Sequence, residues 1–263
     1  MKKTLIAAVL TVLFMVPATY SFALSVDQIV EKANIASYYG GDNGMAKVHM
    51  VITDRRGRTR EREFTILRKD VKDGGDQLYY VYFHKPGDVR KLVFMVHKHV
   101  GKNDDRWLYL PALDLVKRIA ASDKRTSFVG SNFLYEDVSG RSTKADTHTL
   151  KEETGDHWIL DNIPRDPASV EFTHYLIWID KKTYLVDKAE YYNAQGKVYR
   201  KMVAEEVKVI DGIPTVVKSR VEDLNSGGKT ELTFSNIKYN IGIKDSIFTE
   251  RYLRKPPRKF IRR

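Results

Sequence analysis

The residues that could carry out catalysis are few, and their spacing does not form a catalytic site. Gly228-Lys229-Thr230 ends like a phosphate-binding loop, but the first glycine of that motif would fall at Asp223, and a strand pattern follows where the motif requires a helix. Glu136 and Asp137 are adjacent carboxylates, which seldom converge on one substrate as a general acid and base must. No Gly-x-Ser-x-Gly elbow occurs, and the chain has no cysteine to act as a nucleophile. The sequence therefore predicts a protein that is not an enzyme.

Metal and cofactor chemistry has equally weak support. His97 and His99 share one face of a predicted strand and could bind a metal together with His84 or a carboxylate. Two histidines without an identified third ligand are more simply read as a surface pair. The lack of cysteine also excludes disulfides and thiolate metal sites. We therefore expect no metal and no cofactor.

The first 23 residues have the pattern of a secretory signal peptide. Lys2 and Lys3 give a positive start, residues 5–16 form an apolar run, and Ser21-Phe22-Ala23 offers small residues for cleavage. A transmembrane anchor would need about 18 uninterrupted apolar residues, and Pro17 ends this run too early. We expect cleavage after Ala23, which leaves one exported domain over residues 24–263.

The charge balance of this exported domain is basic. The formal net charge is +11, and removal of Lys2 and Lys3 leaves +9. An exported protein meets little nucleic acid, so anionic lipid headgroups or an acidic protein surface are the expected partners, and an ordinary well-charged surface is the simpler alternative. Seven arginines and lysines cluster in residues 251–263 around Pro256-Pro257. This basic tail is expected either to dock on an anionic membrane or transporter, or to fray into solvent.

One helix and many strands are predicted for the domain. Ser25 and Gln28 form a capping box, the apolar stripe of Val26, Ile29, Val30 and Ala33 follows, and Gly40 and Gly41 end the helix. From Met45 the apolar period becomes two, and turn residues separate the runs at hairpin spacing. The predicted strands cover residues 47–53, 60–68, 77–84, 91–97, 106–110, 115–120, 158–163, 174–180, 185–192, 198–209 and 230–236, with a further run between the turn residues 211–212 and 225–228. This pattern of about eleven or twelve strands predicts an antiparallel meander that closes into a barrel or half-barrel.

Several of these strands are apolar on both faces. Residues 78–83, 92–96 and 175–179 lack the alternation of a sheet with one solvent-exposed face, so they need cover on both sides. The helix could cover one side. A filled sandwich core and a cavity both satisfy the other side, and the strand pattern does not decide between them.

The longest break in the strand pattern, residues 122–151, is expected to be functional. A loop of this length in a compact domain is commonly a lid, and its apolar groups Phe128, Phe133, Leu134 and Tyr135 argue against disorder. Residues 132–138 could form a short helix that plugs the barrel mouth, with Ser131 as its cap. Glu136 and Asp137 are expected to cap this lid or to pair with Lys117, Arg118 or Arg141.

Two stretches resemble a known family. Arg106-Trp107-Leu108-Tyr109-Leu110-Pro111-Ala112-Leu113 with Lys117-Arg118-Ile119, and Phe128-Val129-Gly130-Ser131-Asn132-Phe133 with Tyr135-Glu136-Asp137, are similar to the LolA-like outer-membrane lipoprotein-sorting proteins. The resemblance implies a mainly β (α+β) fold, an incomplete antiparallel β-barrel of about 11 strands with an N-terminal helix and a short helical lid over a hydrophobic cavity. It also implies an inward arginine that latches the lid, for which the candidates are Arg60, Arg62 and Arg68.

The resemblance further implies a monomeric periplasmic carrier of lipoprotein or lipid acyl chains. Its partners would be an inner-membrane transporter and an outer-membrane acceptor, with no nucleic acid. The alternative is an accessory protein of a resistance-nodulation-division type exporter without cargo of its own. The residues expected at the cavity or lid are large and apolar or aromatic: Phe94, Trp107, Tyr109, Phe128, Phe133, Leu134, Tyr135 and Trp178.

Overall fold

The capping box at Ser25 begins the first helix, as predicted. The computed structural model of the chain describes residues 24–261, and helix α1 runs over Val26–Tyr38. The Ser25 hydroxyl accepts from the Gln28 amide, and the Gln28 side chain accepts from the Ser25 amide, which satisfies two free helix donors. The predicted signal peptide lies outside the described residues. Among residues 24–261, no helix is long and apolar enough to span a bilayer.

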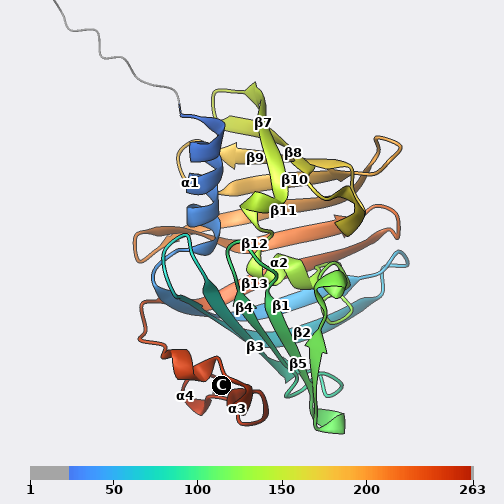
Figure 1. Cartoon of the computed structure of the whole chain (residues 1–263). Helices are drawn as coiled ribbons and strands as arrows, with labels where there is room; N and C mark the ends of the chain where they lie inside the picture. The colour runs from blue at the N-terminus through green and yellow to red at the C-terminus, as the bar shows by residue number, and fades with distance from the viewer. Residues whose placement is uncertain (1–23, 262–263) are drawn as a thin grey trace, which may run out of the picture.

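The strands form one antiparallel sheet that does not close. Its order is β6-β5-β4-β3-β2-β1-β13-β12-β11-β10-β9-β8-β7, so β6 and β7 are its two edges (Figure 1). The bounds are β1 Asn43–Thr53, β2 Thr59–Asp70, β3 Gln77–Lys85, β4 Val93–Lys98, β5 Asp105–Leu110, β6 Leu115–Ile119, β7 Asp146–Glu153, β8 His157–Pro164, β9 His174–Asp180, β10 Val186–Tyr192, β11 Val198–Ile210, β12 Ile213–Asp223 and β13 Gly228–Tyr239. The prediction of a mainly β meander is confirmed. The sheet has 13 strands rather than eleven or twelve, and the additional strand is β7, most of which falls within the predicted long loop of residues 122–151.

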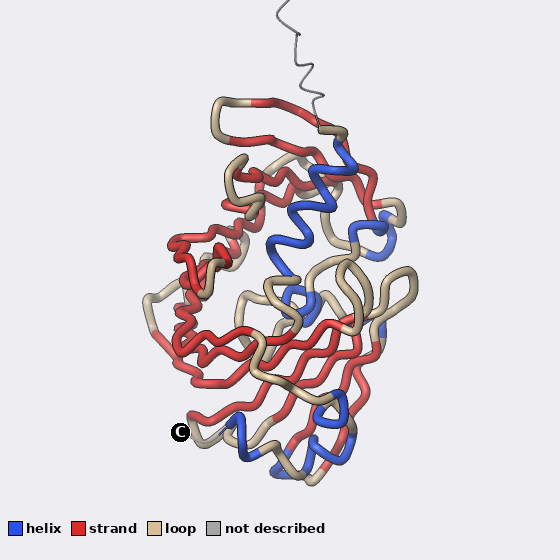
Figure 2. The backbone as a smooth tube through the Cα atoms, turned by 90° about the vertical axis from the view of Figure 1, so that its left-hand side faces the viewer, coloured by secondary structure: helices blue, strands red, loops and turns tan. Residues whose placement is uncertain are grey.

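The sheet is strongly curved. The register of β1 on β13 shifts between Met45 and Lys47, and that of β11 on β12 shifts at Glu206. Such bulges bend a strand and increase its twist. Figure 2 shows the sheet curling around α1 and the loops on its inner side. The inner, concave face can therefore enclose space without closure of a barrel.

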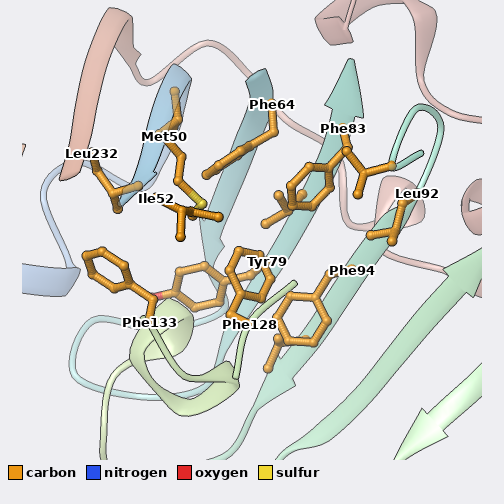
Figure 3. Packing of buried hydrophobic residues seen from close by; sticks show 14 of the residues in the cluster. Met50, Ile52, Phe64, Tyr79, Phe83, Leu92, Phe94, Phe128, Phe133 and Leu232 are labelled. Atoms are coloured by element: carbon orange, nitrogen blue, oxygen red, sulfur yellow. The ribbon is translucent and has the colours of Figure 1, made fainter. Parts of the chain in front are cut away.

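Two of the apolar clusters on the concave face lie on opposite halves of the sheet. One lies on β1–β4 and includes Met50, Phe64 and Phe94 (Figure 3). In the other, Ile29 and Ala33 of α1 pack on Leu160 of β8 and Ile179 of β9. The predicted stripe of α1 thus lies on the far half of the sheet from the first cluster.

The opposite, convex face of β3–β5 is covered by the end of the chain. Helix α3 (Glu250–Arg254) and helix α4 (Arg258–Ile261) bury Leu253 and Phe260 against Tyr80 and Met95. The Tyr80 hydroxyl donates to the Tyr252 carbonyl over 2.7 Å. The C-terminal segment is therefore folded onto the sheet up to residue 261, and the expectation of a frayed tail is wrong for these residues.

Candidate functional site

A cavity of about 500 Å³ lies on the concave face between the two halves of the sheet. Helix α1 contributes Ala33 and Tyr38, and strands from both halves contribute apolar side chains. Those strand residues include Ala46, Met50, Phe64, Ile66, Val81, Ile177, Ala189, Met202, Val216, Leu232 and Phe234. Its size lies within the range of small-molecule sites, and its walls are mostly apolar. The interior of the curved sheet is therefore hollow in part rather than completely filled.

One end of the cavity is closed by residues 124–143, here called the plug. Phe128 and Phe133 line the cavity and are almost fully buried. The Phe128 amide donates to the Phe133 carbonyl over 2.7 Å, so the chain between them forms a tight loop. The Phe128 ring centroid lies 5.4 Å from that of Phe94 and 6.3 Å from that of Phe64 (Figure 3). Two aromatic rings from the plug thus reach into the apolar surface of the sheet.

The plug contains helix α2 (Tyr135–Ser139), which is shorter than predicted. Its N-terminal cap is made by Asp137, whose carboxylate accepts from the Leu134 amide over 2.6 Å. Ser131, the predicted cap, instead donates to the Phe128 carbonyl and accepts from the Phe133 amide. The hydroxyl of Ser131 therefore stabilises the preceding loop, and no free donor of α2 reaches it.

Buried ion pairs join the plug to β11 and join residues of the plug to one another. Arg200 of β11 donates to the Asp137 carboxylate over 2.5 Å, and both side chains are almost fully buried. Arg125 donates to Glu136 over 2.9 Å, and Arg141 lies 3.5 Å from the same carboxylate. Burial alone would raise the pKa of Glu136, but these cations hold it below its ordinary value. The predicted pairing of Glu136 with Arg141 is confirmed.

The other end of α2 is bound to the N-terminal half of the domain. Lys98 of β4 is buried and donates to the Ser139 carbonyl over 2.6 Å. Burial lowers the pKa of Lys98 to about 8, despite nearby carboxylates. Gly140 has a φ of +76°, and a Cβ atom at this position would lie 2.5 Å from the Tyr38 ring of α1. Only glycine permits this close approach of the plug to α1.

The three candidate latching arginines have different partners. Arg68 donates to the Tyr38, Gly40 and Gly41 carbonyls, and so holds the end of α1 over the cavity wall. Arg60 donates to the Gly130 carbonyl of the plug over 3.1 Å. Arg62 pairs with Asp88. The structure thus places two of the three candidates on segments that enclose the cavity.

Five of the eight predicted residues cluster at the plug. Phe128 and Phe133 line the cavity, while Phe94 and Tyr135 pack beside Phe128 at centroid distances of 5.4 Å and 5.7 Å. Phe94 is fully buried, and Phe94, Leu134 and Tyr135 are not among the lining residues. The lipid-binding role of all five residues stays a prediction.

The other three predicted residues lie away from the cavity. Trp107 and Tyr109 face the convex side, where they pack with the cluster of α3 and α4. Trp178 is not among the cavity-lining residues and instead lines a separate surface pocket with His157 and Asp187. The Lys188 ammonium lies 3.6 Å from its ring centroid. Strand alternation explains this placement: Leu108 and Leu110, between and after these aromatics on β5, belong to the concave cluster.

Several residues at the cavity were not predicted. They include Tyr38 of α1, Met202 of β11 and Leu232 of β13. Apolar and polar residues alternate in the predicted strand 230–236, and this alternation could have indicated Leu232 and Phe234 as one apolar face. Arg125 and Arg200 carried no such signal, because their acidic partners come from distant positions in the chain.

The histidines do not form a metal site with one another. His97 makes a 2.8 Å hydrogen bond to the Phe248 carbonyl, and His99 lies 2.9 Å from the Asp76 carboxylate. Within residues 24–261, His157, Asp180 and Asp187 are the group with metal-ligand spacing. The imidazole of His157 pairs with Asp187, while Asp180 accepts from Thr183 and Lys182. These groups are thus already satisfied within the protein.

The fold is similar to several solved structures. A DUF1329 family protein from Desulfovibrio piger is 28% identical over 87% of this chain and 97% of its own, with a TM-score of 0.79. A domain from Vibrio parahaemolyticus described as an outer membrane lipoprotein-sorting protein is 27% identical over 86% and 97%, with a TM-score of 0.77. A LolA superfamily protein from Nitrosomonas europaea, 21% identical over 88% and 100%, has a TM-score of 0.67 and shares the fold.

A family model also matches the chain. The model, described as that of an uncharacterized protein, matches residues 75–255, which is more than half of the chain. The chain belongs to the family of this model. No curated protein matches it. The structural similarity to LolA superfamily and lipoprotein-sorting domains agrees with the resemblance in the sequence, and the LolA-like fold of this chain is an open curved sheet with a plug.

Proposed function

We propose that this LolA-like protein is a periplasmic carrier, which holds the acyl chains of a lipid or lipoprotein in the cavity and moves them towards the outer membrane. The observation that supports the proposal most is the mostly apolar cavity of about 500 Å³ beneath a plug. The similarity to the Vibrio parahaemolyticus domain, which is described as a lipoprotein-sorting protein, supports the same function.

The energetics of lipid transfer require such a cavity. Exposure of one methylene to water costs about 0.8 kcal/mol, so a chain of roughly 14 methylenes costs about 11 kcal/mol to move through water unprotected. A mostly apolar cavity removes most of this cost. Transfer between a bilayer and the cavity is then almost neutral in free energy, and direction has to come from the donor or the acceptor.

The plug supplies the route for entry and release. Its rings occupy apolar surface that acyl chains could also cover. An ion pair from Arg200 to Asp137 and a hydrogen bond from Lys98 to the Ser139 carbonyl hold it at two ends. A donor that displaces Phe133 from the sheet would open the cavity at that end. No nucleotide, metal or catalytic group is needed for this exchange.

The convex side offers a surface for docking on an anionic membrane. Arg251, Lys255 and Arg258 are exposed on or beside α3 and α4, and Leu113 at the neighbouring β5–β6 turn is 70% exposed. Arg254 pairs with Asp114 over 3.0 Å, which fixes the helix to that turn. Cations around exposed apolar residues favour contact with anionic lipid headgroups. In sedimentation with phosphatidylglycerol vesicles at low salt, the parent chain should pellet with the vesicles. The double variant Arg251→Gln/Arg258→Gln should stay in the supernatant.

Native mass spectrometry of the protein from its own cell envelope tests the carrier proposal. The expected result is protein that retains a lipid of defined mass. The variant Ala46→Phe, which places a ring in the cavity, should lose that mass or retain a shorter chain. Ala194→Phe, at an exposed turn, is the matched control and should retain the same lipid. Parent protein that carries no lipid under conditions that preserve folding would contradict the proposal.

A further inference from the structure

A second, polar pocket lies beyond the plug from the cavity. It has a volume of about 350 Å³ and is formed by the β1–β2 turn, the tip of the plug and the β12–β13 turn. The cavity is lined by β1 residues 44–46 and 50, whereas this pocket is lined by Ile52 and Thr53 at the end of the same strand. We call it the arginine pocket; its lining residues are Ile52, Thr53, Asp54, Arg55, Arg56, Arg58, Arg60, Gly130, Ser131, Asn132, Ser226 and Gly228.

The charge of the arginine pocket is strongly positive. Four arginines of the β1–β2 hairpin line it, with Asp54 as the lining carboxylate. Asp54 pairs with Arg58 at 2.6 Å and accepts from the Arg56 amide. Among residues 24–261, Arg55, Arg56 and Arg60 form no ion pair. Three guanidinium groups without a protein counter-charge thus surround one small volume.

The plug supplies the opposite wall of the pocket. Arg60 donates to the Gly130 carbonyl over 3.1 Å, and Val129 and Gly130 have φ values of +50° and +75°. The Asn132 amide group is held by Thr230, which accepts from its backbone N–H and donates to its side-chain oxygen over 2.8 Å. The Asn132 side-chain nitrogen lies 3.2 Å from the Cβ position of Gly228, at the pocket wall. A polar donor is thus fixed opposite the arginines.

Guanidinium groups suit phosphate, because their planar fork can donate two parallel hydrogen bonds to its oxygens. We propose that the arginine pocket binds a phosphate group, supplied by an anionic lipid headgroup or by free phosphate. The proposal does not depend on acyl chains in the cavity, since the two sites have no lining residue in common. Arg60 would then bind the phosphate with the same side chain that donates to the Gly130 carbonyl of the plug.

Calorimetric titration with two probes tests the proposal. The probes are inorganic phosphate and a monomeric short-chain phosphatidylglycerol, each added to the full chain. The variant Arg55→Gln/Arg56→Gln removes two exposed, unpaired cations without loss of the Arg60 contact to the plug. The control Lys72→Gln/Lys182→Gln removes two exposed cations, one from the β2–β3 turn and one from the β9–β10 turn, and gives the same net charge; neither lysine lines the arginine pocket or the cavity.

The expected result is at least a tenfold loss of phosphate affinity in Arg55→Gln/Arg56→Gln and less than a twofold loss in the control. Tighter binding of the short-chain lipid than of phosphate supports a headgroup as the source, and equal binding supports free phosphate. The proposal is overturned if the parent chain binds neither probe, or if both double variants lose the same affinity. The carrier proposal is tested by the lipid mass that the protein retains, which is measured separately. Absence of phosphate binding in the calorimetric titration would therefore leave the carrier proposal unaffected.

Discussion

The ion pair between Arg200 and Asp137 should hold the plug shut, and Arg200→Gln tests this. Both side chains are almost fully buried, with 5% and 7% of their surface exposed. Removal of one partner of a buried pair costs about 3–5 kcal/mol, because the other charge remains buried without compensation. When the plug opens, the pair is broken in the parent chain as well. Arg200→Gln therefore raises the free energy of the closed state and leaves that of the open state almost unchanged.

The size of the effect follows from this cost. A loss of about 3 kcal/mol raises the equilibrium constant for opening by about a hundredfold, since each 1.4 kcal/mol is a factor of ten. Hydrogen exchange of the amides in residues 126–139 should accelerate by this order, while the amides of β8 and β9 change little. Arg62→Gln is the control, because Arg62 is similarly buried but pairs with Asp88 rather than with the plug. Exchange in the plug within threefold of the parent chain, or equal acceleration throughout the sheet, would refute the reasoning.

Two further predictions concern the same segment. Gly140→Ala should destabilise the protein by about 2 kcal/mol or more in urea unfolding, because the new Cβ atom would lie 2.5 Å from the Tyr38 ring. The control Gly196→Ala has a similar φ of +68° and no atom within 4 Å of the new Cβ, so it should cost only about 1 kcal/mol. Equal losses of stability in the two variants would count against the contact between Gly140 and Tyr38. The pKa of Glu136 is held below its ordinary value of 4.5, so its stabilisation is present above that pH and is lost as the pH falls through the lowered pKa. Thermal unfolding between about pH 6 and pH 3 should therefore depend less on pH in Glu136→Gln, and identical slopes would contradict the assignment.

The helix and most strands could be predicted from the sequence, because their signals are local. The capping box of Ser25 and Gln28 and the turn residues between alternating runs need no knowledge of the tertiary structure. Strand β7 was missed because its sequence, Asp146–Glu153, is mostly polar and exposed. The C-terminal helices were missed because they are short and basic, and their burial depends on only a few apolar residues such as Leu253 and Phe260.

The site could be predicted only in part. Phe128 and Phe133 stood out as apolar groups in a long loop, and they do line the cavity. Alternation on β5 places Trp107 and Tyr109 on the same face, but it cannot say which face is concave. That choice depends on α3 and α4, which cover these aromatics from more than 100 positions away in the chain. Whether the sheet closes is also a long-range property, since it depends on pairing between β6 and β7.

The central claim is that acyl chains occupy the cavity beneath the plug. Photolabelling with a fatty acyl lipid that carries a diazirine near its chain end, followed by peptide mapping, tests it most directly. The account predicts labels on cavity residues such as Met50 and Met202, with loss of those labels in Ala46→Phe. Labels confined to the convex face, or unchanged labels in that variant, would contradict it.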